Sequence, residues 1–204
     1  DLLECRGLAG EAPEKETMFL ARRLILCTGG LSLPETGSNG AGLEIARKLG
    51  HTIVPTAPAL TPLTTEDELW PTLSGLSLAV RLDLYLKGKK KAEAKGAFLF
   101  THNGFSGPAA LDISRHYTVA SAIDEPRIKA SFLPDLNEEV LRNSLKSIAD
   151  TPGDIFRFMS DRKGLPKRFA EALIEKCGWT GRKRLPIGWR AKFVQSIFNY
   201  TLEV

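Results

Sequence analysis

The stretch LSLAVRLDLYL at residues 76–86 decides the fold class of this chain. Leucine or valine stands at every second position, and serine, alanine, arginine, aspartate or tyrosine stands between them. A period of two predicts a β-strand with one buried face. A turn rich in lysine follows at 87–91, a partner strand returns over 97–101, and residues 128–132 alternate again. Together these segments predict a small antiparallel β-barrel or sandwich.

The chain after residue 132 has the pattern of helices. Signals that start or end a helix stand at Asn137, in the capping-box sequence Thr151–Asp154, at Pro166 and at Gly178. A last apolar helix precedes a return strand expected at 201–204. This part is therefore predicted to be a helical subdomain.

Working back toward the amino terminus, we find two glycine-rich turns. Strands are expected at Leu2–Arg6 and Met18–Leu26, and the second runs into LILCTGG at 24–30. TGSNGAG at 36–42 then opens a helix. Glycines let the backbone take positive φ and approach a ligand closely, and a helix N-terminus attracts anions. The layout predicts one edge of a nucleotide site, although an ordinary strand–turn–helix connection has the same pattern.

A complete dinucleotide fingerprint is absent. The nearest match, at Gly40–Ile45, has isoleucine where the third glycine of GxGxxG is needed for helix–strand packing. The turn therefore fits a secondary contact to a nucleotide held mainly by another segment. Prolines at 55, 58 and 62 mark a boundary. The expected domains are residues 1–58, 59–132 and 133–204.

Composition narrows the class of protein. The chain has 204 residues, of which 43% are hydrophobic and 25% charged, and no apolar run approaches the length of a membrane span. Its three cysteines are scattered, which argues against a disulfide framework or a zinc site and fits a reducing cytoplasm. We expect a cytoplasmic protein with no metal site.

The carboxy-terminal quarter is basic. Residues 151–204 hold eleven Lys and Arg against five Asp and Glu, a surplus of six, with the clearest clusters at Arg162-Lys163, Lys167-Arg168 and Arg182–Arg184. Basic clusters can contact phosphate backbones. No nucleic-acid reader motif accompanies them, so a solvated face is the favoured interpretation, and nucleic acid is an unlikely partner.

His102 is the candidate catalytic residue. It lies in a loop with Gly104 and Gly107, after a predicted strand and before a helix that Ser106 can cap with Pro108 in the first turn. A histidine placed there can act as general base or as hydrogen-bond donor to a substrate. A loop histidine bonded only to the backbone is the alternative.

Three blocks carry a resemblance to a known family. CTGGLSLPETGS at 27–38 resembles the "ATGG-x-S-x-P-x-T-G-S" block of the bacterial FAD-dependent flavoproteins of the aminoacetone-oxidase-like family. Gly50-His51 with PALTPL at 58–63 is similar to its "GH…PAL-x-PL" block. FTHNGFSGP at 100–108 is similar to its "FTH-x-G-[LF]-SGP" block. The three blocks follow the family's order and cover residues 27–108.

The resemblance implies an FAD-dependent oxidoreductase, in which FAD is bound by the complete protein and not by this chain alone. The implied cofactor contacts are Thr28, Gly29 and Gly30, with Gly37, Ser38, Gly40 and Gly42 close by. The fold class it implies is α+β. An incomplete Rossmann-like FAD-domain fragment is followed by an insert of a small antiparallel β-barrel and a helical subdomain.

In this reading the insert covers the flavin and shapes access for a small-molecule substrate that the sequence does not identify. The expected partner is the remainder of the chain's own FAD domain, without which it is inactive. The alternative is a non-enzymatic interaction module whose basic face could bind nucleic acid.

Overall fold

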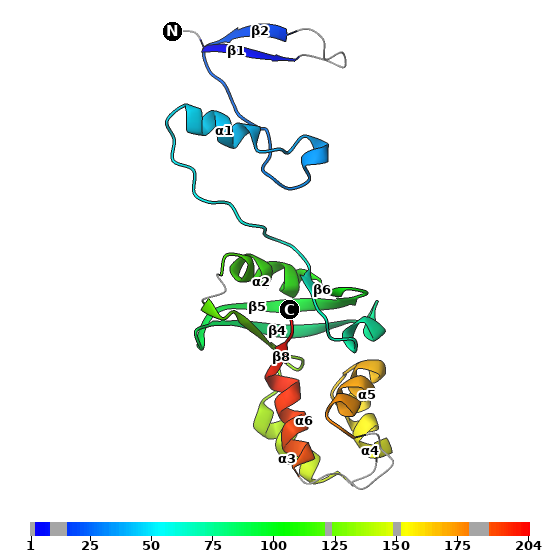
Figure 1. Cartoon of the computed structure of the whole chain (residues 1–204). Coiled ribbons are helices and arrows are strands. Elements are labelled where there is room, and N and C mark those ends of the chain that lie inside the picture. Colours follow the sequence, from blue (N-terminus) through cyan, green and yellow to red (C-terminus); the bar gives the residue numbers. More distant parts are fainter. Residues whose placement is uncertain (1–2, 9–15, 121–123, 149–151, 180–187) are drawn as a thin grey trace. The chain divides into compact units, whose positions relative to one another are not determined.

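The computed structural model describes residues 3–8, 16–120, 124–148, 152–179 and 188–204. The chain forms two compact units, residues 1–56 and 57–204. The first unit contains an antiparallel hairpin of β1 (Leu3–Leu8) and β2 (Glu16–Ala21), followed by helix α1 (Ala41–Lys48) (Figure 1).

The strand expected to run into the first glycine pair is not formed. β2 ends at Ala21, and residues 23–30 have no strand geometry. A strand exists through hydrogen bonds to a neighbouring strand. In the part of the chain that the structure describes, no segment pairs with residues 23–30. Their apolar side chains are accordingly exposed, and Ile25 is 84% accessible.

Helix α1 begins and ends where its glycines predict. Gly40 is its N-cap, with φ at +83°. At the other end the Gly50 N–H donates to the carbonyl of Arg47 at 3.0 Å, and the His51 N–H donates to that of Ala46 at 3.1 Å. This pair of bonds satisfies the last carbonyls of the helix and needs the left-handed backbone that Gly50 supplies.

The second unit is built on one six-stranded antiparallel sheet with the strand order β3-β6-β5-β4-β7-β8. The α+β class is confirmed, and the sheet curls into a half-barrel. Its strands are β3 (Leu63–Thr64), β4 (Ser77–Leu86), β5 (Lys89–Thr101), β6 (Gly104–Ser106), β7 (Arg127–Ser131) and β8 (Tyr200–Leu202).

The alternating stretch forms the central strand β4 as predicted. Val80, Leu82 and Leu84 have no exposed area, so every second side chain enters the core. β5 is longer than expected, because the turn needs only Lys87 and Gly88, both at positive φ. The return strand at the carboxy terminus is also formed, and β8 pairs with β7.

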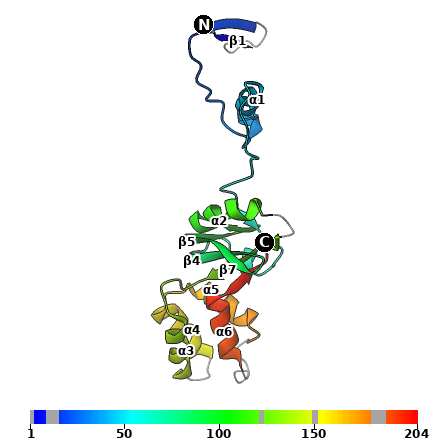
Figure 2. The same cartoon turned by 90° about the vertical axis from the view of Figure 1, so that its left-hand side faces the viewer.

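Helices cover both faces of this sheet. α2 (Pro108–Thr118) lies on one face, and the remaining helices lie on the other (Figures 1 and 2). These are α3 (Glu138–Lys146), α4 (Pro152–Arg157), a π-helical turn at Phe158–Arg162, α5 (Lys167–Lys176) and α6 (Trp189–Phe198).

The structure confirms some of the helix caps predicted from the sequence and not others. The Asn137 side chain accepts a hydrogen bond from the Glu139 N–H at 2.7 Å, which confirms it as the N-cap of α3. Gly178 ends α5 at positive φ, as expected. Ser106 does not cap α2: it ends β6, and Gly107 is the N-cap without any side-chain bond. Thr151, the first residue of the expected capping box, lies outside the described residues.

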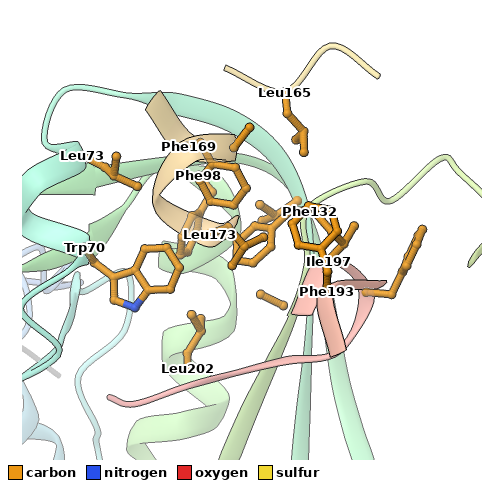
Figure 3. Packing of buried hydrophobic residues seen from close by; sticks show 14 of the residues in the cluster. Trp70, Leu73, Phe98, Phe132, Leu165, Phe169, Leu173, Phe193, Ile197 and Leu202 are labelled. Atoms are coloured by element: carbon orange, nitrogen blue, oxygen red, sulfur yellow. The ribbon is translucent and has the colours of Figure 1, made fainter. Parts of the chain in front are cut away.

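One apolar core joins the sheet to the helices. Trp70 lies in a short 3₁₀ turn (Trp70–Leu73) and is fully buried. Its ring is 5.6 Å from that of Phe100 on β5 and 6.3 Å from that of Phe169 on α5. Phe132, directly after β7, is 4.7 Å from Phe169 (Figure 3). These aromatic contacts hold the α5 region against the sheet without a gap between subdomains.

Candidate functional site

The two glycine turns of the first unit close on each other. A Cβ atom on Gly42 would overlap Thr28 Oγ1, and a Cβ on Gly29 would lie 2.5 Å from Ser38 Oγ. Gly29 also has φ at +69°. The lack of a side chain at Gly42 lets Thr28 pack against the start of α1, and the lack of one at Gly29 lets Ser38 pack against Gly29. Four of the seven predicted cofactor contacts form this cluster, here called the glycine cluster: Thr28, Gly29, Ser38 and Gly42.

The other three predicted contacts have different surroundings. Gly40 is buried, and a Cβ there would lie 2.6 Å from Leu31 Cδ2. Gly37 needs its positive φ of +93° but has open space around it. Gly30 has neither a left-handed backbone nor a close neighbour, so the structure gives no steric reason for glycine at this position.

The first turn of α1 presents backbone donors beside the glycine cluster. The Ala41 N–H donates to Asn39 Oδ1 at 3.1 Å, while the N–H groups of Leu43 and Glu44 bond to the Gly40 carbonyl. The amino end of a helix favours negative charge. Because the Ala41, Leu43 and Glu44 N–H groups already have acceptors within the chain, the feature of this turn that favours an anion is the positive end of the α1 dipole.

His102 belongs to the second unit and lies in a tight turn. Thr101 pairs with Gly104, so His102 and Asn103 alone connect β5 to β6. The Asn103 carbonyl accepts from the Thr65 N–H at 3.1 Å, and Gly104 packs against the backbone of β3. His102 itself is exposed. The short strand β6 thus separates His102 from α2. Hydrogen bonding of this turn fixes the backbone that carries the His102 side chain, which can therefore orient an acid–base group.

Sequence reasoning missed Leu60. This residue has φ at +56° and is 64% exposed, an unusual backbone for a leucine and an unusual place for its side chain. The chain is tied to α2 on both sides of Leu60: the Thr118 hydroxyl donates to the carbonyl of Pro58, two residues before it, and the Thr61 N–H donates to the buried Ser114 hydroxyl at 3.1 Å. Strained residues held so firmly occur most at functional sites. No periodicity in the sequence signals a left-handed leucine.

Sequence reasoning also missed a polar cluster beside Trp70, formed by Asp67, Lys176 and Tyr200. Asp67 forms an ion pair with Lys176 of α5 and accepts a long hydrogen bond from the Tyr200 hydroxyl at 3.5 Å. Burial raises the pKa of Asp67, but the bonds from Lys176 and the Leu69 N–H outweigh it, so the pKa lies below its ordinary value. Burial and the Asp67 charge raise the pKa of Tyr200. The cluster joins the loop before Trp70, α5 and β8.

Several basic residues of the carboxy-terminal quarter serve the fold itself. Lys176 pairs with Asp67, Arg168 donates to the Thr72 carbonyl at 2.6 Å, and Arg190 donates to the Ile148 carbonyl at 3.0 Å. These three basic side chains are bound within the protein, and the interpretation of the remaining surplus as a solvated face stays a prediction. The cluster at Arg182–Arg184 lies outside the described residues.

Within the described ranges, no group of three or more His, Cys, Asp and Glu side chains is arranged to hold a metal ion. Within the same ranges, no helix combines the length and the apolarity that a membrane crossing requires.

A comparison with known families shows to which family the chain belongs. Residues 57–204, all of the second unit, match the family described as "HI0933-like protein barrel and H2TH domain". This chain belongs to the HI0933-like family. The half-barrel sheet and the helices beyond it are thus the folded domain that defines the HI0933-like family, and His102 and Leu60 lie inside it.

Three curated relatives are similar to this member of the HI0933-like family. The ribosomal RNA dihydrouridine synthase of Haemophilus influenzae is 33% identical over 162 residues, 78% of this chain and 37% of that protein. A 3-dehydro-bile acid delta(4,6)-reductase of Clostridium scindens is 30% identical over 65% of this chain and 32% of its own length. The Escherichia coli ribosomal RNA dihydrouridine synthase is 30% identical over 61% and 30%, respectively. The chain thus spans about a third of the length of these relatives.

Proposed function

We propose that this chain is the insert-bearing section of a bacterial, cytoplasmic FAD-dependent reductase. Family membership and the names of the relatives support the proposal. Both names describe reductions, since making dihydrouridine adds two hydrogens to a pyrimidine ring. The finer resemblance to the aminoacetone-oxidase-like flavoproteins, carried by the three blocks at 27–108, is part of this proposal.

The glycine cluster is the observation that carries the cofactor assignment. Thr28 packs against Gly42 in the first turn of α1 and Ser38 packs against Gly29, and the absence of side chains on the two glycines makes this packing possible. When bound, the flavin supplies hydride transfer. The residues of this chain contribute backbone and hydroxyl contacts, and the second unit covers the cofactor and shapes access to it. In this arrangement His102 holds or moves a proton on the substrate side.

A substitution of Gly42 in the complete protein tests the proposal. Gly42 lies in a helix, so Gly42→Ala raises helix propensity by about 1 kcal/mol. Its Cβ would nevertheless meet Thr28 Oγ1. We expect the dissociation constant for FAD to rise by about tenfold or more if this overlap costs at least about 1.4 kcal/mol of binding energy, so that the variant loses FAD on dilution. The ratio of flavin to protein in the purified sample, read from absorbance at about 450 nm, measures this loss.

Gly50→Ala is the matched control. Gly50 lies at the opposite end of α1, has φ at +89° and has no atom near its Cβ position. Gly50→Ala strains the backbone at the end of α1, which Gly42→Ala does not, but it leaves the glycine cluster unobstructed, so FAD content should stay unchanged. Full FAD retention in Gly42→Ala would refute the assignment. We further propose that the isolated chain of 204 residues retains no FAD and is colourless after purification.

A second candidate function is contact with RNA by the basic carboxy-terminal quarter. It is favoured by two relatives whose names specify ribosomal RNA. The structural use of Lys176, Arg168 and Arg190 speaks against it. We expect the isolated chain to bind RNA weakly and to lose that binding by about 0.2 M salt, as phosphate attraction alone does. Binding that depends on RNA sequence and persists above that salt concentration would instead establish the RNA candidate.

A further inference from the structure

A pocket in the second unit has no role in the function proposed above. It has a volume of about 400 Å³ and lies where the start of β4 and the segment after β7 meet the turn that follows the π-helical residues. We propose that this pocket binds a small molecule with an apolar body and a single anionic group.

The floor of the pocket selects the apolar body. Phe132 and Leu165 are 1% and 3% exposed and close the pocket from the core side. Figure 3 shows both side chains in the same aromatic and aliphatic cluster. A pocket of this volume with a mainly apolar lining is typical of small-molecule sites. Its apolar lining consists of Leu78, Ala79, Phe132, Leu133, Leu136 and Leu165.

The rim selects the anion. Arg162 and Lys163 line one side of the pocket, and Asp135 is its carboxylate. Asp135 forms an ion pair with Lys95 of β5, so its charge is already balanced. No ion pair involves Arg162 among the described residues. The rim therefore has a net positive charge, and its guanidinium can bind a carboxylate or sulfonate with two parallel hydrogen bonds.

Local backbone structure holds these cations in place. The π-helical turn at Phe158–Arg162 widens the helix, and such turns are common at functional sites. Lys163 Nζ lies 5.1 Å from the centre of the Phe158 ring. Gly164, at φ +70°, reverses the chain so that Leu165 returns to the core, and the Leu165 N–H bonds to the Met159 carbonyl at 3.2 Å. The backbone that carries the two cations is thus anchored by the buried side chains of Phe158, Met159 and Leu165.

Another pocket of the same unit serves as an internal comparison. It is lined by Thr64, Thr65, Glu66, Glu203 and Val204. Its two glutamates and lack of lining cations disfavour an anion. A ligand chosen by charge should therefore distinguish the two pockets.

Naphthalene sulfonate and the neutral naphthalene sulfonamide are the probes, titrated into the full chain and followed by ¹H–¹⁵N NMR. We expect the sulfonate to shift the amides of Leu78, Ala79 and Gly164 and to bind about tenfold more tightly than the sulfonamide, as one charge-assisted hydrogen bond allows. Equal affinity of the two probes would overturn the proposal, as would shifts confined to Thr64–Glu66.

Two variants separate the rim from the floor. Arg162→Gln should weaken sulfonate binding by about tenfold and leave sulfonamide binding unchanged. Ala79→Trp adds a large side chain at an exposed strand position and should abolish binding of both probes. Lys89→Gln is the control, because it removes one charge from the β4–β5 hairpin outside the pocket. Sulfonate affinity that is the same in Arg162→Gln as in Lys89→Gln would refute the role of the rim, and unaltered binding in Ala79→Trp would refute the location.

Discussion

The glycine cluster and the central strand β4 owe their conformations to different physics. Around the glycine cluster, apolar side chains face solvent: Ile25 is 84% exposed, Leu33 67% and Val54 78%. On β4, Leu82 and Leu84 are fully buried. The first region is shaped by backbone conformation and close approach, and the second by removal of apolar surface from water. A region of the first kind can be well formed locally and still need a partner surface, which we propose is the remainder of its own FAD domain.

The largest expected effect contrasts Leu84→Ala with Ile25→Ala. Leu84→Ala removes fully buried methyl groups between β5 and β7 and should lower the free energy of unfolding by about 3 kcal/mol. Ile25→Ala should leave it unchanged because that side chain is already in water. Far-ultraviolet circular dichroism reports on the helices and strands of both units, so urea unfolding followed by this signal measures both variants. A comparable loss in Ile25→Ala would break the contrast between the two regions.

A substitution at His102 also compares the two regions, because His102 lies in the second unit. In the complete protein, His102→Ala should leave FAD bound, since the glycine cluster lies in the first unit. Turnover should fall by about 100-fold if the imidazole transfers a proton. Steady-state rates and flavin content measured on the same preparation separate the two effects. Unchanged turnover with a lower melting temperature would show that the histidine is structural.

A smaller loss of stability is expected for a substitution in the polar cluster beside Trp70. Asp67→Asn removes the charge that binds Lys176 and should lower the free energy of unfolding by about 2 kcal/mol at neutral pH. The pKa of Asp67 is lowered in the folded state, so its contribution is complete above the ordinary Asp pKa and is lost as pH falls below about 4. Urea unfolding of both proteins should therefore converge in acid.

Asp112→Asn is the control for that prediction, because Asp112 is exposed on α2. It should change stability by less than about 0.5 kcal/mol. A constant difference between the wild type and Asp67→Asn from pH 7 down to about pH 3 would contradict the assigned pKa direction.

The sequence by itself determined the features that depend on neighbouring residues. The alternation at 76–86 identified β4, Asn137 identified the start of α3, and Gly50 and Gly178 identified helix ends. Each rests on one side-chain periodicity or on one hydrogen bond within a few residues. The blocks at 27–108 likewise pointed to flavoproteins, and the HI0933-like family was then established for the second unit.

Only the tertiary structure decided what depends on distant residues. β3 and β6 are too short to show a period; β3 exists because it bonds to β6, and β6 because it bonds to both β3 and β5. The apolar run at 24–27 has strand composition but no pairing partner among the described residues, so it is not a strand. Ser106 has the residue type of a helix cap but is used by the sheet. The ion pair of Asp67 with Lys176, 109 positions apart, leaves no local signal. A buried hydrogen-bonding group or charge pairs with whichever group the packed fold places next to it.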